Sequence, residues 1–363
     1  MGEVKNHGNN FALLHFIGAC MVIYGHMHDL LQVPGPSLLG NGINALGVKM
    51  IFVITGYLVA NSYLREKKLG RYMVRRLIRI YPAMFACLFL SVVLIGPIAT
   101  TLDMGSYFSQ CWHYLWNNLL LRPDYMLPGV FASNPYPGAV NGSLWTMPVE
   151  VLMYLVVALL CMLLYRLPEK QRKRAACAVV ALVCLADVAR LYLAPELRTV
   201  VWWTDWCAAL NDIPYFLFGF LFEAGGLKKY CNLQLATIVF VVACFLQWRY
   251  IEAIAILVVP YFVMSFALCE KPIFAKLFTK NNIAYGVYLW GFPIQQLLTD
   301  FLKVRWQMPF GPNAMFLISL VPVVILALLS HRFLEIPVEG FLKRKLLPKR
   351  TTGRTNKTAL ENL

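Results

Sequence analysis

The chain has 363 residues, of which 59% are hydrophobic and only 14% charged, and its mean hydropathy is +0.61. This is far more apolar side chain than a water-soluble domain of this length buries, so a soluble enzyme is excluded. The net charge of +15 does not indicate nucleic-acid binding, because Lys and Arg occur in short clusters between apolar segments. We therefore predict an all-α membrane helix bundle with cytoplasmic basic loops.

Ten apolar segments of about 20 residues are each long enough to cross a membrane as a helix. They lie near residues 11–31, 46–63, 77–101, 147–165, 175–194, 208–224, 232–248, 251–269, 283–301 and 313–334. The first segment is longer than the apolar region of a signal peptide and lacks a small-residue cleavage site, so we expect it to be retained.

The basic residues follow every second segment. They are Arg65, Lys67, Lys68, Arg71, Arg75 and Arg76 after the second segment, Arg166, Lys170, Arg172, Lys173 and Arg174 after the fourth, Lys228 and Lys229 after the sixth, and Lys271, Lys276 and Lys280 after the eighth. The alternate loops contain one basic residue, Arg122, within 102–146 and none within 32–45. This alternation predicts that both termini are cytoplasmic. Residues 1–347 are expected to form one transmembrane domain, and 348–363 a basic, disordered cytoplasmic tail.

Two ionisable side chains, His26 and Glu150, stand out within apolar segments. His26 lies about 7–8 Å below the outer surface at 1.5 Å per residue, and Glu150 lies in the first turn of the fourth segment. Such groups are costly in lipid and are functional candidates by default. A neutral imidazole accepts a hydroxyl proton well, and a carboxylate can fix its tautomer. A lone histidine can equally serve only to hydrogen-bond a neighbouring helix, and His28 with Asp29 forms a more superficial pair.

Arginines accumulate where the third apolar segment begins. Arg71, Arg75 and Arg79 recur every four residues, so a helix presents them as one stripe with Arg76 alongside. Arginines at this spacing can hold phosphates through paired N–H groups. A cytoplasmic anchor explains the earlier members equally well, whereas Arg79 already lies within the apolar segment.

The loop at 102–146 is long and rich in Trp, Tyr, Asn, Pro and Gly. Its residues 107–121 are amphipathic enough for an interfacial helix anchored by Trp112 and Trp116. Aromatic and amide side chains suit a carbohydrate, and an aromatic belt explains the same composition. The ten cysteines lack metal-binding spacing and are interpreted as small hydrophobic residues, with a disulfide between Cys111 and Cys207 left open.

Six segments in order resemble acyltransferase family 3, a family of integral-membrane O-acyltransferases, and together they cover nearly the whole chain. They are NFALLHFIGACMVIYGH at 10–26, GVKMIFVITGYLVA at 47–60, RRLIRIYPA at 75–83, SLWTMPVEVLMYL at 143–155, IAYGVYLWGFPI at 283–294 and HRFLEIPVEGFLKR at 331–344.

The resemblance implies an enzyme that takes an acyl group, usually acetyl, from cytoplasmic acyl-CoA and delivers it to a hydroxyl of a cell-surface glycan. It implies His26 as the catalytic base and Glu150 as its partner or a second acid/base. Arg76 and Arg79, with the neighbouring Arg75, would hold the CoA phosphates. The remaining implied roles are a contact of Lys49 with the donor or with an acid inside the bundle, and support of the site by Ser143, Trp145 and His15.

The implied setting is the bacterial inner membrane, with several helices passing through its lipids. Acetyl-CoA is the expected donor, and the acceptor is a glycan such as lipopolysaccharide O-antigen, another polysaccharide or a lipid-linked saccharide. Neither a metal nor nucleic acid is expected.

Two positions depart from the family pattern. The family usually has arginine eleven residues before the catalytic histidine, where this chain has His15, which is not reliably charged at neutral pH. The family often has histidine after the Leu-Trp pair, where this chain has Gly291. We therefore expect no catalytic role at position 291.

A transporter or flippase for a lipid-linked sugar is the alternative from another class. Such folds commonly contain inverted repeats with helices broken at matching positions, and the sequence has no such symmetry. A non-catalytic assembly protein, the third alternative, leaves the six ordered motifs unexplained.

Overall fold

The computed structural model describes residues 9–246, 248–269, 272–273 and 283–347. The tail predicted at 348–363 and the basic residues Lys271, Lys276 and Lys280 lie outside the described residues.

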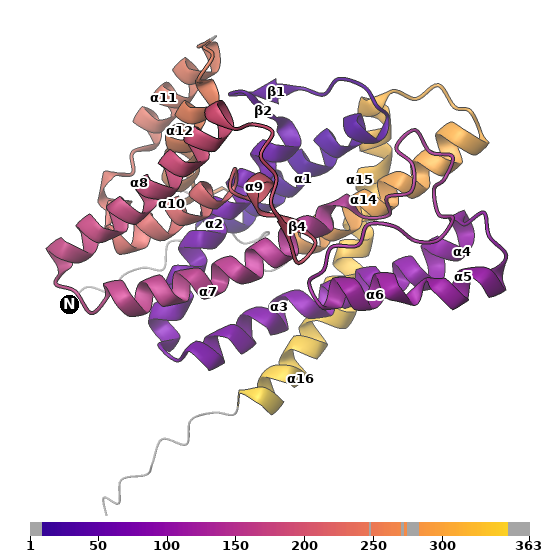
Figure 1. Cartoon of the computed structure of the whole chain (residues 1–363), viewed down its shortest axis with the longest axis horizontal. Helices are drawn as coiled ribbons and strands as arrows, with labels where there is room; N and C mark the ends of the chain where they lie inside the picture. Colours follow the sequence, from indigo (N-terminus) through magenta and orange to yellow (C-terminus); the bar gives the residue numbers. More distant parts are fainter. Residues whose placement is uncertain (1–8, 247, 270–271, 274–282, 348–363) are drawn as a thin grey trace, which may run out of the picture.

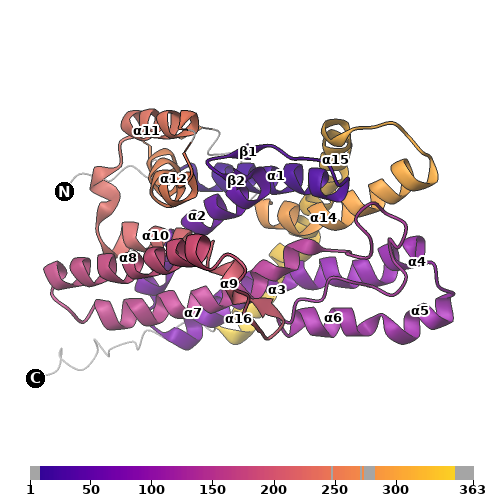
Figure 2. The same ribbon diagram turned by 45° about the horizontal axis from the view of Figure 1, so that its top comes forward.

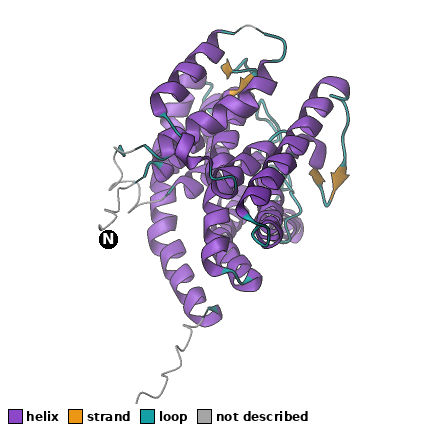
Figure 3. Cartoon of the chain, turned by 90° about the vertical axis from the view of Figure 1, so that its left-hand side faces the viewer, coloured by secondary structure: helices purple, strands orange, loops and turns teal. Residues whose placement is uncertain are grey.

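The described chain is a bundle of helices, and its strands form two small hairpins (Figures 1 and 3). The first half contains α1 Phe11–Leu30, β1 Ser37–Leu38, β2 Asn41–Gly42, α2 Ile43–Glu66, α3 Leu69–Leu90, α4 Gly96–Ala99, α5 Met104–Gln110, α6 Trp112–Leu119 and α7 Thr146–Leu164. The second half contains α8 Glu169–Leu193, β3 Val200–Val201, β4 Thr204–Asp205, α9 Trp206–Ala209, α10 Ile213–Ala224, α11 Leu233–Phe245, α12 Ile251–Ala267, α14 Ala284–Thr299, α15 Pro312–Ser330 and α16 Ile336–Leu346. Each hairpin pairs its two strands antiparallel. Helices α3 and α7 run side by side in Figure 2, and α16 extends from the bundle in Figure 1.

Every predicted apolar segment contains a helix. Among the described residues, six helical stretches are long and apolar enough to cross a membrane, namely Phe11–Leu30, Ile43–Glu66, Leu69–Ala99, Gly142–Leu164, Glu169–Leu193 and Pro312–Leu346. Helices α10, α11 and α12 are apolar but shorter. The chain is therefore an all-α membrane protein, whereas the count of ten spans and the side of each terminus stay predictions.

Helix α2 packs against α1 and α10 through glycines. A Cβ atom at Gly56 of α2 would lie 1.9 Å from the Phe216 carbonyl oxygen of α10, and one at Gly219 of α10 would lie 2.0 Å from the Val53 carbonyl oxygen. A Cβ atom at Gly47 of α2 would approach the carbonyl oxygen of α1 residue Gly18 to 2.6 Å. Small residues allow such close approach in a membrane, where helices gain little from hiding apolar surface. These contacts place α2 at the centre of the bundle.

Aromatic and polar contacts fold the 102–146 loop onto α3. The predicted helix at 107–121 is present as α5 and α6, with a break at Cys111. The α6 side chains of Trp112 and Trp116 are exposed, as expected for anchors. Tyr107 donates a 2.7 Å hydrogen bond to the carbonyl of Val92, in the π-helical turn Ser91–Ile95 that ends α3.

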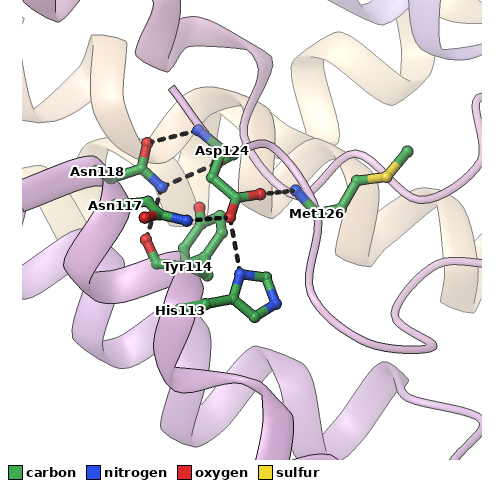
Figure 4. A network of polar contacts seen from close by, with 6 residues as sticks. All are labelled: His113, Tyr114, Asn117, Asn118, Asp124 and Met126. Carbon is green, nitrogen blue, oxygen red and sulfur yellow. Dashed lines mark hydrogen bonds and ion pairs between the residues drawn. The ribbon is translucent and has the colours of Figure 1, made fainter. Parts of the chain in front are cut away.

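Contacts of Asp124 with side chains of α6 hold the segment that follows this helix (Figure 4). Its carboxylate contacts His113 Nδ1 at 2.8 Å and accepts a hydrogen bond from Asn117 Nδ2 at 3.1 Å. The Asn118 amide donates to the Asp124 carbonyl at 2.8 Å and accepts from its N–H at 3.1 Å. The loop is therefore a structured element rather than an open linker.

The cysteine disulfide left open by the sequence is not formed. All ten cysteines are within the described residues, and none of them forms a disulfide. Cys111 donates to the carbonyl of Phe108, and Cys207 donates to Thr199 Oγ1 at 3.3 Å.

Replacing Gly56 with Ala should destabilise the protein strongly, because the new methyl group meets backbone that cannot rotate away. Overpacking of this kind costs about 1–3 kcal/mol or more, which thermal unfolding of the detergent-solubilised protein would detect. Gly340→Ala in α16 is the matched control, since nothing lies within 4 Å of its added Cβ atom. Equal melting temperatures for the two variants would contradict the close crossing.

Candidate functional site

The first cavity, called here the arginine cavity, has a volume of about 310 Å³ and lies between α1, α2, α3, α7 and α14. Along α2 its lining extends from Val48 to Arg65, which is 17 residues and about 25 Å at 1.5 Å per residue. Arg76 and Arg79 of α3 line it with Arg65, while Phe52 contributes to its apolar wall. The cavity is therefore long and positively charged on part of its length.

Arg76 and Glu150 are the best-defined charged groups of the arginine cavity. The Arg76 guanidinium lies 5.7 Å from the ring centre of Tyr72 and 5.8 Å from that of Tyr154, so two aromatic faces hold it. Its Nε atom is buried without a hydrogen-bond partner. The Tyr154 hydroxyl donates to the Glu150 carboxylate, one turn earlier on α7. The arginines thus face the cavity together with one acid.

The predicted arginine stripe is divided between two environments. Arg71 Nε and Arg75 Nη2 contact the Glu66 carboxylate at 3.1 and 2.9 Å, at the turn between α2 and α3. Arg75 does not line the arginine cavity, and its side chain is 47% exposed. The structure thus separates Arg75, which contacts Glu66, from Arg76 and Arg79, which line the cavity, while phosphate binding by these arginines stays a prediction.

Lys49 is paired with an acid and lies outside the arginine cavity. Its side chain is 1% exposed, and its Nζ contacts Asp212 Oδ1 at 3.3 Å. Val48 and Ile51 line the arginine cavity, whereas Lys49 projects from another face of α2 towards Asp212 and the Tyr215 ring. The structure thus places Lys49 beside an acid inside the bundle, Asp212, which is one of the two predicted alternatives.

A second buried ion pair lies on α8. Arg190 Nη2 contacts Asp187 Oδ1 at 3.2 Å, and the Asp187 side chain is fully buried. Pairing keeps such charges tolerable inside an apolar bundle. These charges therefore have a structural explanation.

The second cavity, called here the His26 cavity, has a volume of about 570 Å³ and lies at the C-terminal end of α1. It is lined by His26, Asp29 and Gln32 from α1 and the following turn, with Tyr136 from the long loop and Phe292 from α14. The His26 ring meets the Phe292 ring edge-on, with centroids 5.2 Å apart. Its Nδ1 atom is buried without a hydrogen-bond partner. No group of acids, His and Cys that could hold a metal is found among the described residues.

His26 and Glu150 are not brought together. They line different cavities, and the Glu150 carboxylate accepts its hydrogen bond from Tyr154. His15 lines the arginine cavity and lies 3.4 Å from Thr55 Oγ1. Because His15 and His26 are eleven residues apart on α1, the helix reaches the two cavities at depths about 16 Å apart. The carboxylate that shares the His26 cavity is Asp29, which accepts from Asn44 Nδ2 at 2.7 Å.

Ser143 and Trp145 belong to the 3₁₀ turn Gly142–Trp145 that precedes α7. The Ser143 carbonyl accepts hydrogen bonds from Thr146 Oγ1 and from the Tyr288 hydroxyl, both at 3.1 Å. Trp145 is partly buried against the hydrophobic core. Neither residue lines the arginine cavity or the His26 cavity, so any support that they give to these cavities acts through this turn.

Several cavity residues escaped the sequence reasoning. Arg65 was assigned to the basic loop, yet it lines the arginine cavity. Tyr154 could have been found, because it follows Glu150 by four residues and so shares its helix face. Tyr288 and Phe292 gave no such signal, since their relation to α7 and α1 depends on how α14 packs.

Comparison with known proteins shows the family of the chain. A family model described as an acyltransferase domain matches residues 10–332. The chain therefore belongs to acyltransferase family 3.

Two of the following three relatives are named as O-acetyl transferases. The chain is 25% identical to an O-acetyl transferase of Shigella phage Sf6, over 90% of this chain and 95% of that protein. It is 30% identical to nodulation protein 10 of Rhizobium leguminosarum bv. viciae, over 50% of this chain and 51% of that protein. It is 24% identical to the O-acetyltransferase OatA of Staphylococcus aureus, over 84% of this chain but 54% of that protein. No solved structure matches.

Replacing Lys49 with Met should lower the free energy of unfolding by about 3–5 kcal/mol, because it leaves the buried Asp212 carboxylate unpaired. Adding Asp212→Leu should restore much of that loss, since apolar replacement of both partners is often neutral. Thermal unfolding of the single and double variants measures the coupling. A stable Lys49→Met protein with weakened acyl-CoA binding would instead return Lys49 to a donor role.

Proposed function

We propose that this protein is a membrane O-acyltransferase that moves an acyl group, acetyl in the simplest case, from cytoplasmic acyl-CoA to a hydroxyl of a glycan outside the inner membrane. The observation that carries the proposal is the pair of cavities at two depths along α1, one with three arginines and the other with His26. A reaction whose donor and acceptor come from opposite sides of a membrane needs such a separation. The names of the phage Sf6 and Staphylococcus aureus relatives support an O-acetyl transfer.

The arginine cavity suits an acyl-CoA. Arg65, Arg76 and Arg79 supply guanidinium groups that bind phosphates through paired N–H donors. The Arg76 Nε atom has no hydrogen-bond partner in the protein, so it leaves a donor for a phosphate oxygen. Beyond the arginines, Val48, Phe52 and other apolar side chains continue the cavity along α2, where an extended pantetheine arm would fit.

The His26 cavity suits the acceptor. Asp29 and Gln32 offer hydrogen-bonding groups for sugar hydroxyls, and the Tyr136 and Phe292 rings offer apolar faces. The neutral His26 imidazole would take the hydroxyl proton as the oxygen attacks the thioester carbon. The CoA thiolate would leave through the arginine cavity. An acyl-histidine intermediate is the alternative chemical route.

Glu150 takes a different part in this proposal from the one the sequence favoured. Since its carboxylate faces the arginine cavity with Arg76 and Arg79, it would position these arginines before the donor binds. Asp29 is better placed to assist His26, because both line one cavity and are three residues apart on α1.

The expected cellular setting remains the bacterial inner membrane, with both termini in the cytoplasm. That orientation would open the Arg65 end of the arginine cavity to cytoplasmic acetyl-CoA and the His26 cavity to the outside. Lipopolysaccharide O-antigen, another polysaccharide or a lipid-linked saccharide would then supply the hydroxyl.

Replacing Arg79 with Ala should weaken acyl-CoA binding about tenfold or more, because a charge-assisted phosphate contact is worth roughly 1.5–3 kcal/mol. Titration of the detergent-solubilised protein with labelled acetyl-CoA measures the dissociation constant. Arg75→Ala is the matched control, since Arg75 pairs with Glu66 outside the cavity. If the Arg79→Ala and Arg75→Ala proteins bind acetyl-CoA with the same affinity, the arginines serve only as a cytoplasmic anchor of the helix.

Replacing His26 with Ala should abolish ester formation while leaving protein level and acetyl-CoA affinity nearly intact. Mass spectrometry of surface polysaccharides from cells that carry each variant shows the loss as a mass difference of one acyl group. His28→Gln serves as the control, because His28 lines neither cavity and donates to the Tyr24 carbonyl at 3.0 Å. Full acylation by the His26→Ala protein would contradict the assignment of His26 as the catalytic base.

A further inference from the structure

The arginine cavity and the His26 cavity share a thin wall. On one side of it, Gly142 lines the His26 cavity and Thr146 lines the arginine cavity. On the other side, Phe292 lines the His26 cavity and Tyr288 lines the arginine cavity, on the same helix α14. Each pair is four residues apart, so the wall is about one helical turn, or roughly 6 Å, thick.

Half of this wall is held by hydrogen bonds. Thr146 Oγ1 and the Tyr288 hydroxyl are 2.8 Å apart, and both contact the Ser143 carbonyl at 3.1 Å. All three side chains are buried. This closed set of contacts makes the Thr146 and Tyr288 side a fixed end of the arginine cavity.

The other half is formed by the ring of Phe292, which is 5% exposed and packs in one apolar cluster with Leu30 and Ala139. This ring meets the His26 ring edge-on at 5.2 Å and the Tyr136 ring at 6.3 Å. It also occupies the space beside Gly142, where an added Cβ atom would lie 2.6 Å from Phe292 Cε2. Because the ring is closely packed on several sides, it has little room to move. Phe292 therefore fixes the boundary of the space next to His26 on the α14 side.

We infer that Phe292 determines which acyl groups are transferred, by limiting the space that the acyl chain occupies beside His26. The inference rests on the proposed acyl transfer and specifies its donor. The bond between the acyl carbon and the CoA sulfur breaks, and a bond to the acceptor oxygen forms. His26 receives the hydroxyl proton, and the thiolate takes up a proton as CoA leaves. For this to happen the acyl carbon must reach the wall, where a two-carbon group fits against the ring and a longer chain collides with it.

The test compares acetyl-CoA with butyryl-CoA on the full-length protein in proteoliposomes. The acceptor is the cell's own surface polysaccharide, stripped of its esters by mild alkali. Phe292→Ala should raise the ratio of butyryl to acetyl transfer at least about tenfold, since two methylene groups in an apolar pocket discriminate by at least that factor. Gly142→Ala should lower the ratio, because its methyl group presses on the ring.

Phe245→Ala is the matched control, because Phe245 lies on α11 with 81% of its surface exposed and lines neither cavity. Its ratio should equal that of the unmodified protein. If Phe292→Ala fails to fold, Phe292→Leu keeps the wall filled and should give an intermediate increase. If the Phe292→Ala protein still transfers acetyl and its ratio is unchanged, the role of Phe292 is overturned while the proposed function stands. If the unmodified protein forms no ester with acetyl-CoA and none with butyryl-CoA, the proposed function is overturned, and this inference with it.

Discussion

The close crossing of α2 with α1 and α10 is the constraint on which the rest of the structure depends. Glycines at positions 47, 56 and 219 bring backbone against backbone, and no other residue fits at 56 or 219 without moving a neighbouring carbonyl. In lipid this packing is a main source of attraction between helices. The position of α2 also directs its side chains to different neighbours. Val48 and Ile51 line the arginine cavity, whereas Lys49 contacts Asp212 at the start of α10. A shift of α2 would therefore disturb the cavity and the buried ion pair together.

Charges inside the bundle fall into two kinds that serve different ends. Lys49 of α2 pairs with Asp212 at the start of α10, and Asp187 pairs with Arg190 within α8, so each of these charges has a partner of opposite sign in the protein itself. Arg76 and Arg79 face an open cavity, with Glu150 as the acid beside them. A cavity with an excess of positive charge is suited to bind an anion. The ion pairs carry no net charge and therefore do not attract one. This distinction is the reason why we propose Arg76 and Arg79, rather than Lys49, as groups that bind the donor.

The division of the site was only partly predictable from the sequence. The spacing predicted one stripe of Arg71, Arg75 and Arg79 with Arg76 alongside. In the structure, Arg71 and Arg75 contact Glu66, whereas Arg76 and Arg79 line the cavity. His26 and Glu150 were both expected in the outer half, which is compatible with their positions along the chain. Their separation into two cavities depends on the turn at 142–145 and on α14, whose Tyr288 and Phe292 stand between them. No local pattern reveals a contact between segments that are about 140 residues apart.

By itself, the sequence determined the class of this protein: an apolar helical membrane chain, with its helices close to where hydropathy placed them, and a member of acyltransferase family 3 by its ordered motifs. These properties follow from composition, period and local spacing, which a chain carries whatever its neighbours are. Only the tertiary structure decided which ionisable groups meet, which face a cavity, and that two cavities lie one helical turn apart. Those outcomes depend on how each helix is rotated about its axis and on how closely distant backbones approach. A rotation of a few tens of degrees would form a different site from a sequence with the same hydropathy profile.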